Sequence, residues 1–371
     1  MKRHLKPLKI DLSQYPDGLL NGIGDFCGTI LSVSNGLESA MRQFHPPQIP
    51  GIQKALQPFA SRLKLSRKQF EDMVVGINGD VVIDQLLNAA EAAERSLDYI
   101  MGADHPQEAI GQMMKAMRQH YRAQEHLYPL ILGLKPVGRY FLEPGVRDRL
   151  EDFNSLPVDE TLTGLFLDQG EDIGGGYCLY VPESYDGQTD WPLVVALHGG
   201  SGRGRDFIWL WMREARSRRF LLLAPSSTDR TWSFEDRTDA DAILQMIDVV
   251  SAKWRVDNGR MLLTGMSDGA IYSLICGLHP DAPFSALAPV SGVLHPVDLS
   301  HTSGKRIYMV HGTLDWMFSV HHAHHAFARL KGAGADIHFQ EISNLSHTYP
   351  REENPSILTW FDDSLSLNRQ W

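Results

Sequence analysis

The chain lacks the features that mark membrane-spanning, exported and disulfide-rich proteins. Its 371 residues contain no apolar run approaching the roughly eighteen residues of a membrane-spanning helix. The basic start, Met1 to Pro7, has no apolar stretch of the kind a secretory signal needs. The three cysteines, Cys27, Cys178 and Cys276, are odd in number and too far apart for a disulfide framework or a CxxC site. We therefore expect a cytoplasmic protein with reduced thiols.

Extremes of composition are also missing. Hydrophobic residues make up 43% and charged residues 22%, which excludes wholesale disorder. The net charge of −10 is uneven, because residues 1–155 carry 18 Lys and Arg against 18 Asp and Glu, whereas residues 156–371 carry 17 against 27. An acidic second part repels phosphate backbones. We expect no nucleic-acid partner and a neutral small molecule as substrate.

Residues 1–155 have the pattern of a mostly helical N-terminal domain. Ser66 to Gln69 has the form of a capping box, which predicts a helix start there. Apolar residues at helical spacing then run from 83 to 100 and from 110 to 121. Prolines and glycines between about 133 and 160 predict a boundary near residue 155. Three interrupted helices are too few for a large core of their own, so we expect this domain to act as a cap or as a homo-oligomer contact.

Residues 156–371 alternate short β-rich runs with helix-length segments. Most of these runs are uninterruptedly apolar, as in a sheet covered on both faces. The predicted strands are 162–167, 177–181, 193–197, 220–224, 261–264, 286–290, 307–310 and 337–342. Strand followed by helix, repeated, predicts an α/β domain with a mostly parallel sheet flanked by helices. In such sheets, functional groups gather in the loops at the carboxyl ends of strands.

The strongest chemical signal is the sequence Gly265-Met-Ser267-Asp-Gly269. It follows a predicted strand and precedes a predicted helix, and this context gives G-x-S-x-G its meaning. Two glycines permit a sharp turn that would project the Ser267 hydroxyl at a helix N-terminus, where developing negative charge is favoured. Such strings also occur by chance in loops, and the flanking elements favour Ser267 as a nucleophile.

A second glycine-rich loop, His198-Gly-Gly-Ser-Gly202, follows the predicted strand 193–197. Phosphate binding is disfavoured because the chain has no GxGxxG and no Walker lysine. Acyl transfer needs backbone N–H groups directed at the carbonyl oxygen of the substrate, so we assign these donors to Gly200 and Asp268. We interpret His198 as structural.

A serine nucleophile needs a histidine base and a carboxylate that orients it. Chain order identifies both, since each partner belongs in a loop after a late strand. Asp315 is the acid in the loop after strand 307–310, and His347 is the histidine after strand 337–342. The sequence therefore predicts a Ser267-Asp315-His347 triad.

These motifs, together with Tyr180-Val-Pro182 and Asp257-Asn-Gly-Arg260, resemble the phospholipase/carboxylesterase branch of the α/β-hydrolases. The resemblance covers about residues 160–365 and implies a serine esterase that needs no cofactor. The same skeleton is similar to that of polyhydroxybutyrate depolymerases and feruloyl esterases, so it does not fix the substrate. Asp268 departs from the neutral residue frequent beside the nucleophile. The resemblance does not extend to residues 1–155.

Other residues carry weaker signals. Trp232, Gly199 and Trp316 are candidate substrate-binding residues, although Trp232 is equally consistent with an ordinary buried tryptophan. The cluster His321 to His325 suggests a metal by its spacing, but an amphipathic helical face explains it better, and we expect no metal. The leading hypothesis is a carboxylesterase acting through an acyl-enzyme. A polyester or feruloyl-ester hydrolase and a catalytically silent binding protein on the same fold remain alternatives.

Overall fold

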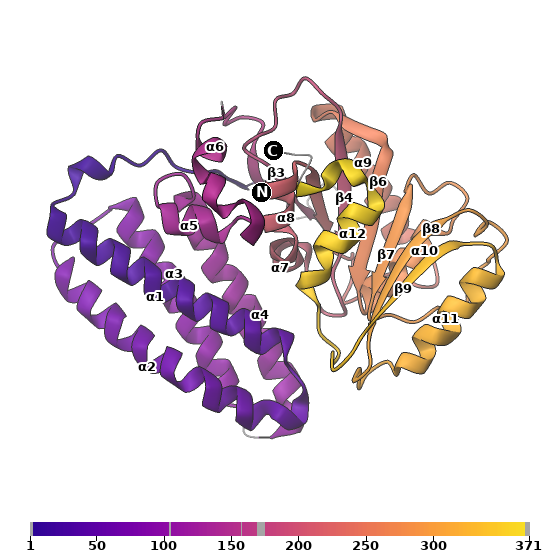
Figure 1. The fold of residues 1–371 in the computed structure, drawn as a ribbon, viewed down its shortest axis with the longest axis horizontal. Helices are drawn as coiled ribbons and strands as arrows, with labels where there is room; N and C mark the ends of the chain where they lie inside the picture. The colour runs from indigo at the N-terminus through magenta and orange to yellow at the C-terminus, as the bar shows by residue number, and fades with distance from the viewer. Residues whose placement is uncertain (1–2, 104, 157, 169–174, 368–371) are drawn as a thin grey trace. The chain divides into compact units, whose positions relative to one another are not determined.

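The computed structural model describes residues 3–103, 105–156, 158–168 and 175–367, which form two compact units (Figure 1). One unit is Lys6–Asn154, and the other begins at Ser155 and also includes the first five residues. The division therefore falls beside residue 155, but the start of the chain belongs to the second unit. The reason is a short strand that pairs with the sheet of that unit.

The described part of the unit Lys6–Asn154 is built mainly on the long helices α1 to α4 (Figure 1). Its helices are α1 (Asp17–Arg42), α2 (Ile49–Met73), α3 (Val81–Met101), α4 (Pro106–Leu127), α5 (Lys135–Tyr140) and α6 (Leu150–Asn154). Ile30, Leu37 and Leu63 are fully buried, and the rings of Phe26 and Phe70 stack with centroids 4.4 Å apart. The expectation that this segment lacks a core of its own was wrong, because α1 and the first half of α2 were not predicted.

The predicted capping box at Ser66 was also wrong. Helix α2 continues through Ser66, whose hydroxyl lies 3.4 Å from Thr29 Oγ1 instead of capping a helix. Leu56, Leu63 and Phe70 are buried along one face of α2, so packing extends the helix across the local start signal. A side-chain cap does begin α3, where Asp80 Oδ1 accepts from the backbone N–H of Val82 at 2.9 Å.

The second unit contains a nine-stranded sheet. Its strands are β1 (Arg3–Leu5), β2 (Gly164–Asp168), β3 (Tyr177–Val181), β4 (Trp191–Leu197), β5 (Leu221–Pro225), β6 (Val256–Met266), β7 (Ala286–Val290), β8 (Arg306–Gly312) and β9 (Asp336–Ile342). Their spatial order is β1-β2-β3-β5-β4-β6-β7-β8-β9, antiparallel from β1 to β5 and parallel from β5 to β9. All eight predicted strands are confirmed, and β1 is an additional edge strand.

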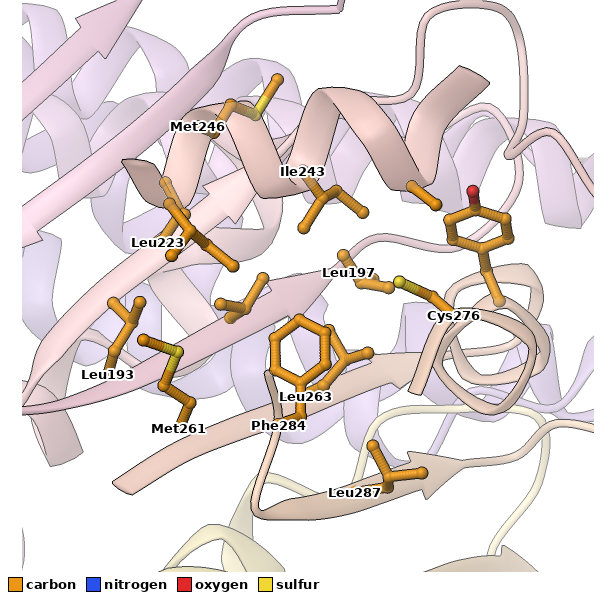
Figure 2. Packing of buried hydrophobic residues seen from close by; sticks show 14 of the residues in the cluster. Leu193, Leu197, Leu223, Ile243, Met246, Met261, Leu263, Cys276, Phe284 and Leu287 are labelled. Carbon is orange, nitrogen blue, oxygen red and sulfur yellow. The ribbon is translucent and has the colours of Figure 1, made fainter. Parts of the chain in front are cut away.

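Helices cover both faces of this sheet, as the mostly parallel class requires. They are α7 (Gly204–Phe207), α8 (Met212–Arg218), α9 (Thr238–Lys253), α10 (Asp268–Gly277), α11 (Val320–Gly332) and α12 (Asn354–Phe361). Figure 2 shows Ile243 and Met246 of α9 packed over strand leucines such as Leu197. Val194 and Ala196, which point to the opposite face, are equally buried. Among the described residues, no helix is long and apolar enough to cross a bilayer.

Candidate active site

Ser267 occupies a tight turn between β6 and α10. Its backbone has φ 56° and ψ −121°, a conformation that a non-glycine residue adopts only when its surroundings enforce it. A β-carbon at Gly265 would lie 2.4 Å from the carbonyl oxygen of Gly269, and one at Gly269 would lie 2.4 Å from that of Leu197. Both flanking positions therefore require glycine. The turn places Ser267 at the carboxyl edge of the parallel strands.

His347 connects Ser267 to Asp315. Its Nε2 lies 3.0 Å from Ser267 Oγ, and its Nδ1 lies 2.8 Å from Asp315 Oδ2. Asp315 follows β8 and His347 follows β9, the neighbouring parallel strand. The structure thus brings together the three residues that chain order singled out.

The surroundings of Asp315 determine the tautomer of His347. Asp315 Oδ1 accepts from the backbone N–H groups of Met317 at 3.0 Å and Phe318 at 2.8 Å. Asp315 Oδ2 is a carboxylate oxygen and accepts, so the contact with His347 Nδ1 places the ring proton on Nδ1. The lone pair of Nε2 is then directed at the Ser267 hydroxyl, which donates to it.

Two aromatic rings hold the imidazole of His347 from the side. The edge-to-face contacts have centroid distances of 5.9 Å to Trp316 and 5.5 Å to Phe318. Trp316 is partly exposed, so it lies at the border of the site, where a substrate-binding residue was predicted. The neighbouring side chains of Leu314 and Met317 are exposed large hydrophobic groups. The Asp315 loop therefore presents an apolar surface next to His347.

His311 lies close to Asp315 but is directed elsewhere. Its Nε2 is 2.7 Å from the carbonyl oxygen of Phe318, to which it donates, and 3.5 Å from Asp315 Oδ2. Burial lowers the pKa of His311, so the ring stays neutral at neutral pH. His311 thus supports the Asp315 loop without reaching Ser267.

The glycine loop after β4 lies beside the turn that carries Ser267. A β-carbon at Gly199 would be 3.4 Å from Ser267 Cβ. Within the described part of the chain, the backbone N–H groups of Gly200 and Asp268 donate to no protein acceptor. The amide of Ser267 is already engaged, since it donates to the carbonyl oxygen of Val290 at 3.0 Å. These contacts leave Gly200 and Asp268 as donors for a ligand oxygen.

His198 and Trp232 support the glycine loop from within. His198 Nδ1 donates to the carbonyl oxygen of Gly199 at 2.7 Å, and Nε2 accepts from Ser227 N at 3.0 Å. Burial lowers the pKa of His198 to about 4. Trp232 Nε1 donates to the carbonyl oxygen of His198 at 2.8 Å, and only 2% of Trp232 is exposed. The prediction of Trp232 as a substrate-binding residue is therefore corrected, because its indole supports the loop and offers almost no surface.

The sheet order and the serine turn together decide the fold of this unit. An antiparallel β3 precedes a parallel series in which β4 and β5 exchange places, and the turn that carries Ser267 follows β6. It is an α/β-hydrolase fold.

Two curated proteins with esterase in their names are similar to part of the chain. No family model matches the chain. It is similar to a bifunctional acetylxylan esterase/xylanase of Neocallimastix patriciarum, 24% identical over 202 residues, covering 52% of this chain and 29% of that protein. It is also similar to a probable feruloyl esterase C of Aspergillus terreus, 25% identical over 128 residues, covering 32% of this chain and 47% of that protein. The chain thus spans less than half the length of either relative.

Among solved structures, acetyl xylan esterase from Aspergillus awamori aligns with a TM-score of 0.45 and 17% identity. The alignment covers 53% of this chain and 98% of that one. The names of these proteins describe their own activities.

The histidine cluster of the α/β-hydrolase unit lies on α11, away from the triad in sequence. His324 Nε2 is 2.9 Å from Glu341 Oε2, and both side chains are exposed. His324 therefore contacts a surface carboxylate of β9. In the described ranges, no group of three or more His, Cys, Asp or Glu side chains gathers as metal ligands would.

Two residues that support the site were missed by sequence reasoning. Asp239, which is 1% exposed, accepts from the backbone N–H groups of Thr228 at 2.8 Å and Ser233 at 2.7 Å. Thr231 donates its hydroxyl to Asp268 Oδ2 at 2.6 Å. Asp239 lies in the first turn of α9, where an acidic side chain is favoured, whereas nothing local marks Thr231.

Proposed function

We propose that the chain is a serine carboxylesterase with Ser267 as nucleophile, His347 as general base and acid, and Asp315 as the orienting carboxylate. The observation that carries the proposal is the continuous hydrogen-bonded series from Asp315 through His347 to Ser267. A silent binding protein would have no need to keep three such groups in contact within a strained turn.

The acylation step follows from the donor and acceptor roles. Ser267 Oγ attacks the ester carbonyl carbon while its proton moves to His347 Nε2, and Asp315 stabilises the imidazolium that forms. The tetrahedral intermediate then collapses. The carbon–oxygen bond to the alcohol breaks, and the alcohol leaves with the proton from His347 Nε2. Ser267 carries the acyl group at the end of this step.

The negative charge of the intermediate needs donors that are in place beforehand. We assign them to the backbone amides of Gly200 and Asp268, which approach Ser267 from the glycine loop and from the first turn of α10. The N-terminus of α10 adds a favourable dipole at the same point. Water, activated by His347, then attacks the acyl carbon and regenerates Ser267.

We propose small or aromatic acyl esters as the substrate class. The apolar surface of Leu314, Trp316 and Met317 beside His347 suits an uncharged acyl or alcohol group. The names of the two curated relatives make acetyl and feruloyl esters specific candidates. A polyester of hydroxyalkanoic acid is a further candidate carried by the resemblance of the motifs.

The experiment is a hydrolysis screen with purified protein and purified Ser267→Ala. The panel contains p-nitrophenyl esters of graded acyl length, acetylated xylan, methyl ferulate and polyhydroxybutyrate. Hydrolysis by the native protein that the variant lacks supports an esterase, and the preferred ester identifies the acyl class. Equal activity of both proteins on every substrate would contradict the proposal.

We further propose that residues 6–154 take no part in the bond chemistry and act as a cap or as a contact between copies of the chain. The second unit supplies nucleophile, base, acid and amide donors by itself. The test is a shortened protein in which a flexible linker replaces residues 6–154, so that β1 is retained. If it folds, it should hydrolyse p-nitrophenyl acetate but differ in chain-length preference or in mass in solution. A folded but inactive protein would contradict the proposal.

A further inference from the structure

Asp268, the residue after Ser267, contacts two loops through one carboxylate oxygen. The hydroxyl of Thr231 donates to Asp268 Oδ2 at 2.6 Å, a short distance typical of a charge-assisted bond. A β-carbon on Gly200 would lie 2.6 Å from the same oxygen. Asp268 therefore rests directly on the Cα of Gly200 while it is bonded to Thr231. Any side chain at position 200 would have to displace this carboxylate.

The loop that carries Thr231 also holds the loop that carries Gly200. The backbone N–H of Ser201 donates to the carbonyl oxygen of Arg230 at 2.9 Å, and Arg230 Nε donates to Ser201 Oγ at 3.0 Å. Ser201 itself has φ 59°, so the backbone just after Gly200 is strained and needs such support. The Thr231–Asp268 bond joins this loop pair to the first residue of α10.

Both candidate oxyanion donors thus belong to residues that meet at this contact. The amide of Asp268 is fixed by α10, whereas the amide of Gly200 lies on a loop whose position depends on its neighbours. Two donors stabilise an oxyanion only when both lie at hydrogen-bond distance from the same point. A shift of the glycine loop would change that spacing without unfolding the protein.

We propose that the Thr231 hydroxyl and the Asp268 carboxylate form a clasp that positions the Gly200 amide for the oxyanion, which makes both side chains positioning residues. This inference rests on the proposed esterase function. The clasp acts through its geometry. The negative charge of Asp268 by itself opposes a developing oxyanion, so an uncharged acceptor at the same place should serve as well.

The test measures kcat and KM for p-nitrophenyl acetate in the full chain. Thr231→Val and Asp268→Ala each remove the clasp, and we expect kcat to fall about tenfold or more while KM changes less than about twofold, because oxyanion contacts form in the transition state. Thr231→Ser and Asp268→Asn keep a donor and an acceptor, and should retain kcat within about threefold. The double variant Thr231→Val/Asp268→Ala should be no slower than the slower single variant.

The matched control is Thr228→Val in the same loop. It removes a similar bond, from Thr228 Oγ1 to Asp239 Oδ1 at 2.8 Å, while the backbone N–H groups of Thr228 and Ser233 still donate to Asp239. We expect kcat to stay within about twofold. Thermal melting of each variant separates loss of fold from loss of rate. If Thr231→Val fails to fold, the comparison of Asp268→Ala with Asp268→Asn decides.

The outcomes separate this inference from the proposed function. If Ser267→Ala is inactive but Thr231→Val and Asp268→Ala keep the native kcat, the clasp is overturned and the esterase stands. If the two single-variant losses of kcat multiplied in the double variant, the clasp would also be overturned. The same holds if Thr228→Val lost as much kcat as Thr231→Val. If Ser267→Ala retains native activity, the proposed function itself fails, and the clasp with it.

Discussion

Asp315 and His347 lie 32 residues apart in the chain, yet Asp315 Oδ2 and His347 Nδ1 are 2.8 Å apart. The strands that precede them are parallel neighbours in register, with Gly312 of β8 opposite Ile342 of β9. Loops that leave such strands emerge at the same edge of the sheet. Asp315 and His347 therefore meet because of the sheet topology.

Replacement of Ser267 by alanine should leave a folded protein with almost no esterase activity. We expect a loss of kcat on the order of 10⁶-fold, the scale seen when a triad nucleophile is removed. The measurement is steady-state hydrolysis of the preferred p-nitrophenyl ester, with circular dichroism to verify folding. Turnover close to native, in protein purified free of host esterases, would refute the role of Ser267.

Alanine at His347 should be comparably damaging, because Ser267 then has no base. Gln at His311 is the matched comparison, since His311 is also buried near Asp315 but donates to the carbonyl oxygen of Phe318. A glutamine amide can make the same donation, so we expect a loss of kcat of less than about tenfold. The measurement is kcat of both variants and of the native protein at the same pH. If kcat fell more in His311→Gln than in His347→Ala, His347 would not be the base.

The stability of the protein should depend on pH through His198. Burial lowers the pKa of His198 to about 4, whereas the unfolded chain binds this proton near its ordinary value of 6.5. The folded state with neutral His198 is therefore fully stabilised above about pH 6.5, and this stabilisation is lost as the pH falls through 4. The free energy of unfolding should decrease by about 3 kcal/mol once the pH lies below both pKa values. Protonation would also place an N–H on Nε2, which now accepts from Ser227 N.

Urea unfolding of the native protein and of His198→Gln at pH 7 and pH 4.5 tests this dependence. Glutamine can accept from Ser227 N but does not titrate, so the variant should lose less stability between the two pH values than the native protein does. Equal losses in the two proteins would show that His198 is not the titrating group.

The exposed side chains of Leu314 and Met317 should set the preference for acyl length. Serine at both positions removes apolar surface beside the base, so kcat/KM for octanoyl esters should fall about three- to tenfold while that for acetyl esters changes little. Val249→Ser is the control, because Val249 is equally exposed but lies on α9. A uniform loss across all chain lengths would instead indicate damage to the Asp315 loop.

Much of the second unit could be predicted because its information is local or follows from chain order. Buried parallel strands are continuous apolar runs, and the serine turn needs glycines that are visible in the sequence. Asp315 and His347 were singled out because each follows a late strand, and the structure places the two side chains in contact. The edge strand β1 escaped prediction because its three residues form no pattern and depend on pairing with β2, as in Arg3 opposite Leu167.

Other features depend on packing that no local signal reports. Helix α1 contains several glycines, which concealed its buried series including Ile23, Phe26 and Ile30. The contact of Thr231 with Asp268 joins residues 37 positions apart in the chain, through a loop without periodicity. The supporting role of Trp232 could not be predicted without knowing that the carbonyl oxygen of His198 lies next to its indole N–H.

Ser267 should become acylated during turnover. The most direct measurement mixes the protein with excess p-nitrophenyl butyrate, stops the reaction in acid within the first turnover, and locates the acyl group by mass spectrometry of peptides. We predict one butyryl group on Ser267, formed together with a burst of p-nitrophenol, and neither in Ser267→Ala. Steady hydrolysis with no acyl group on Ser267, or with the acyl group on another residue, would contradict the account.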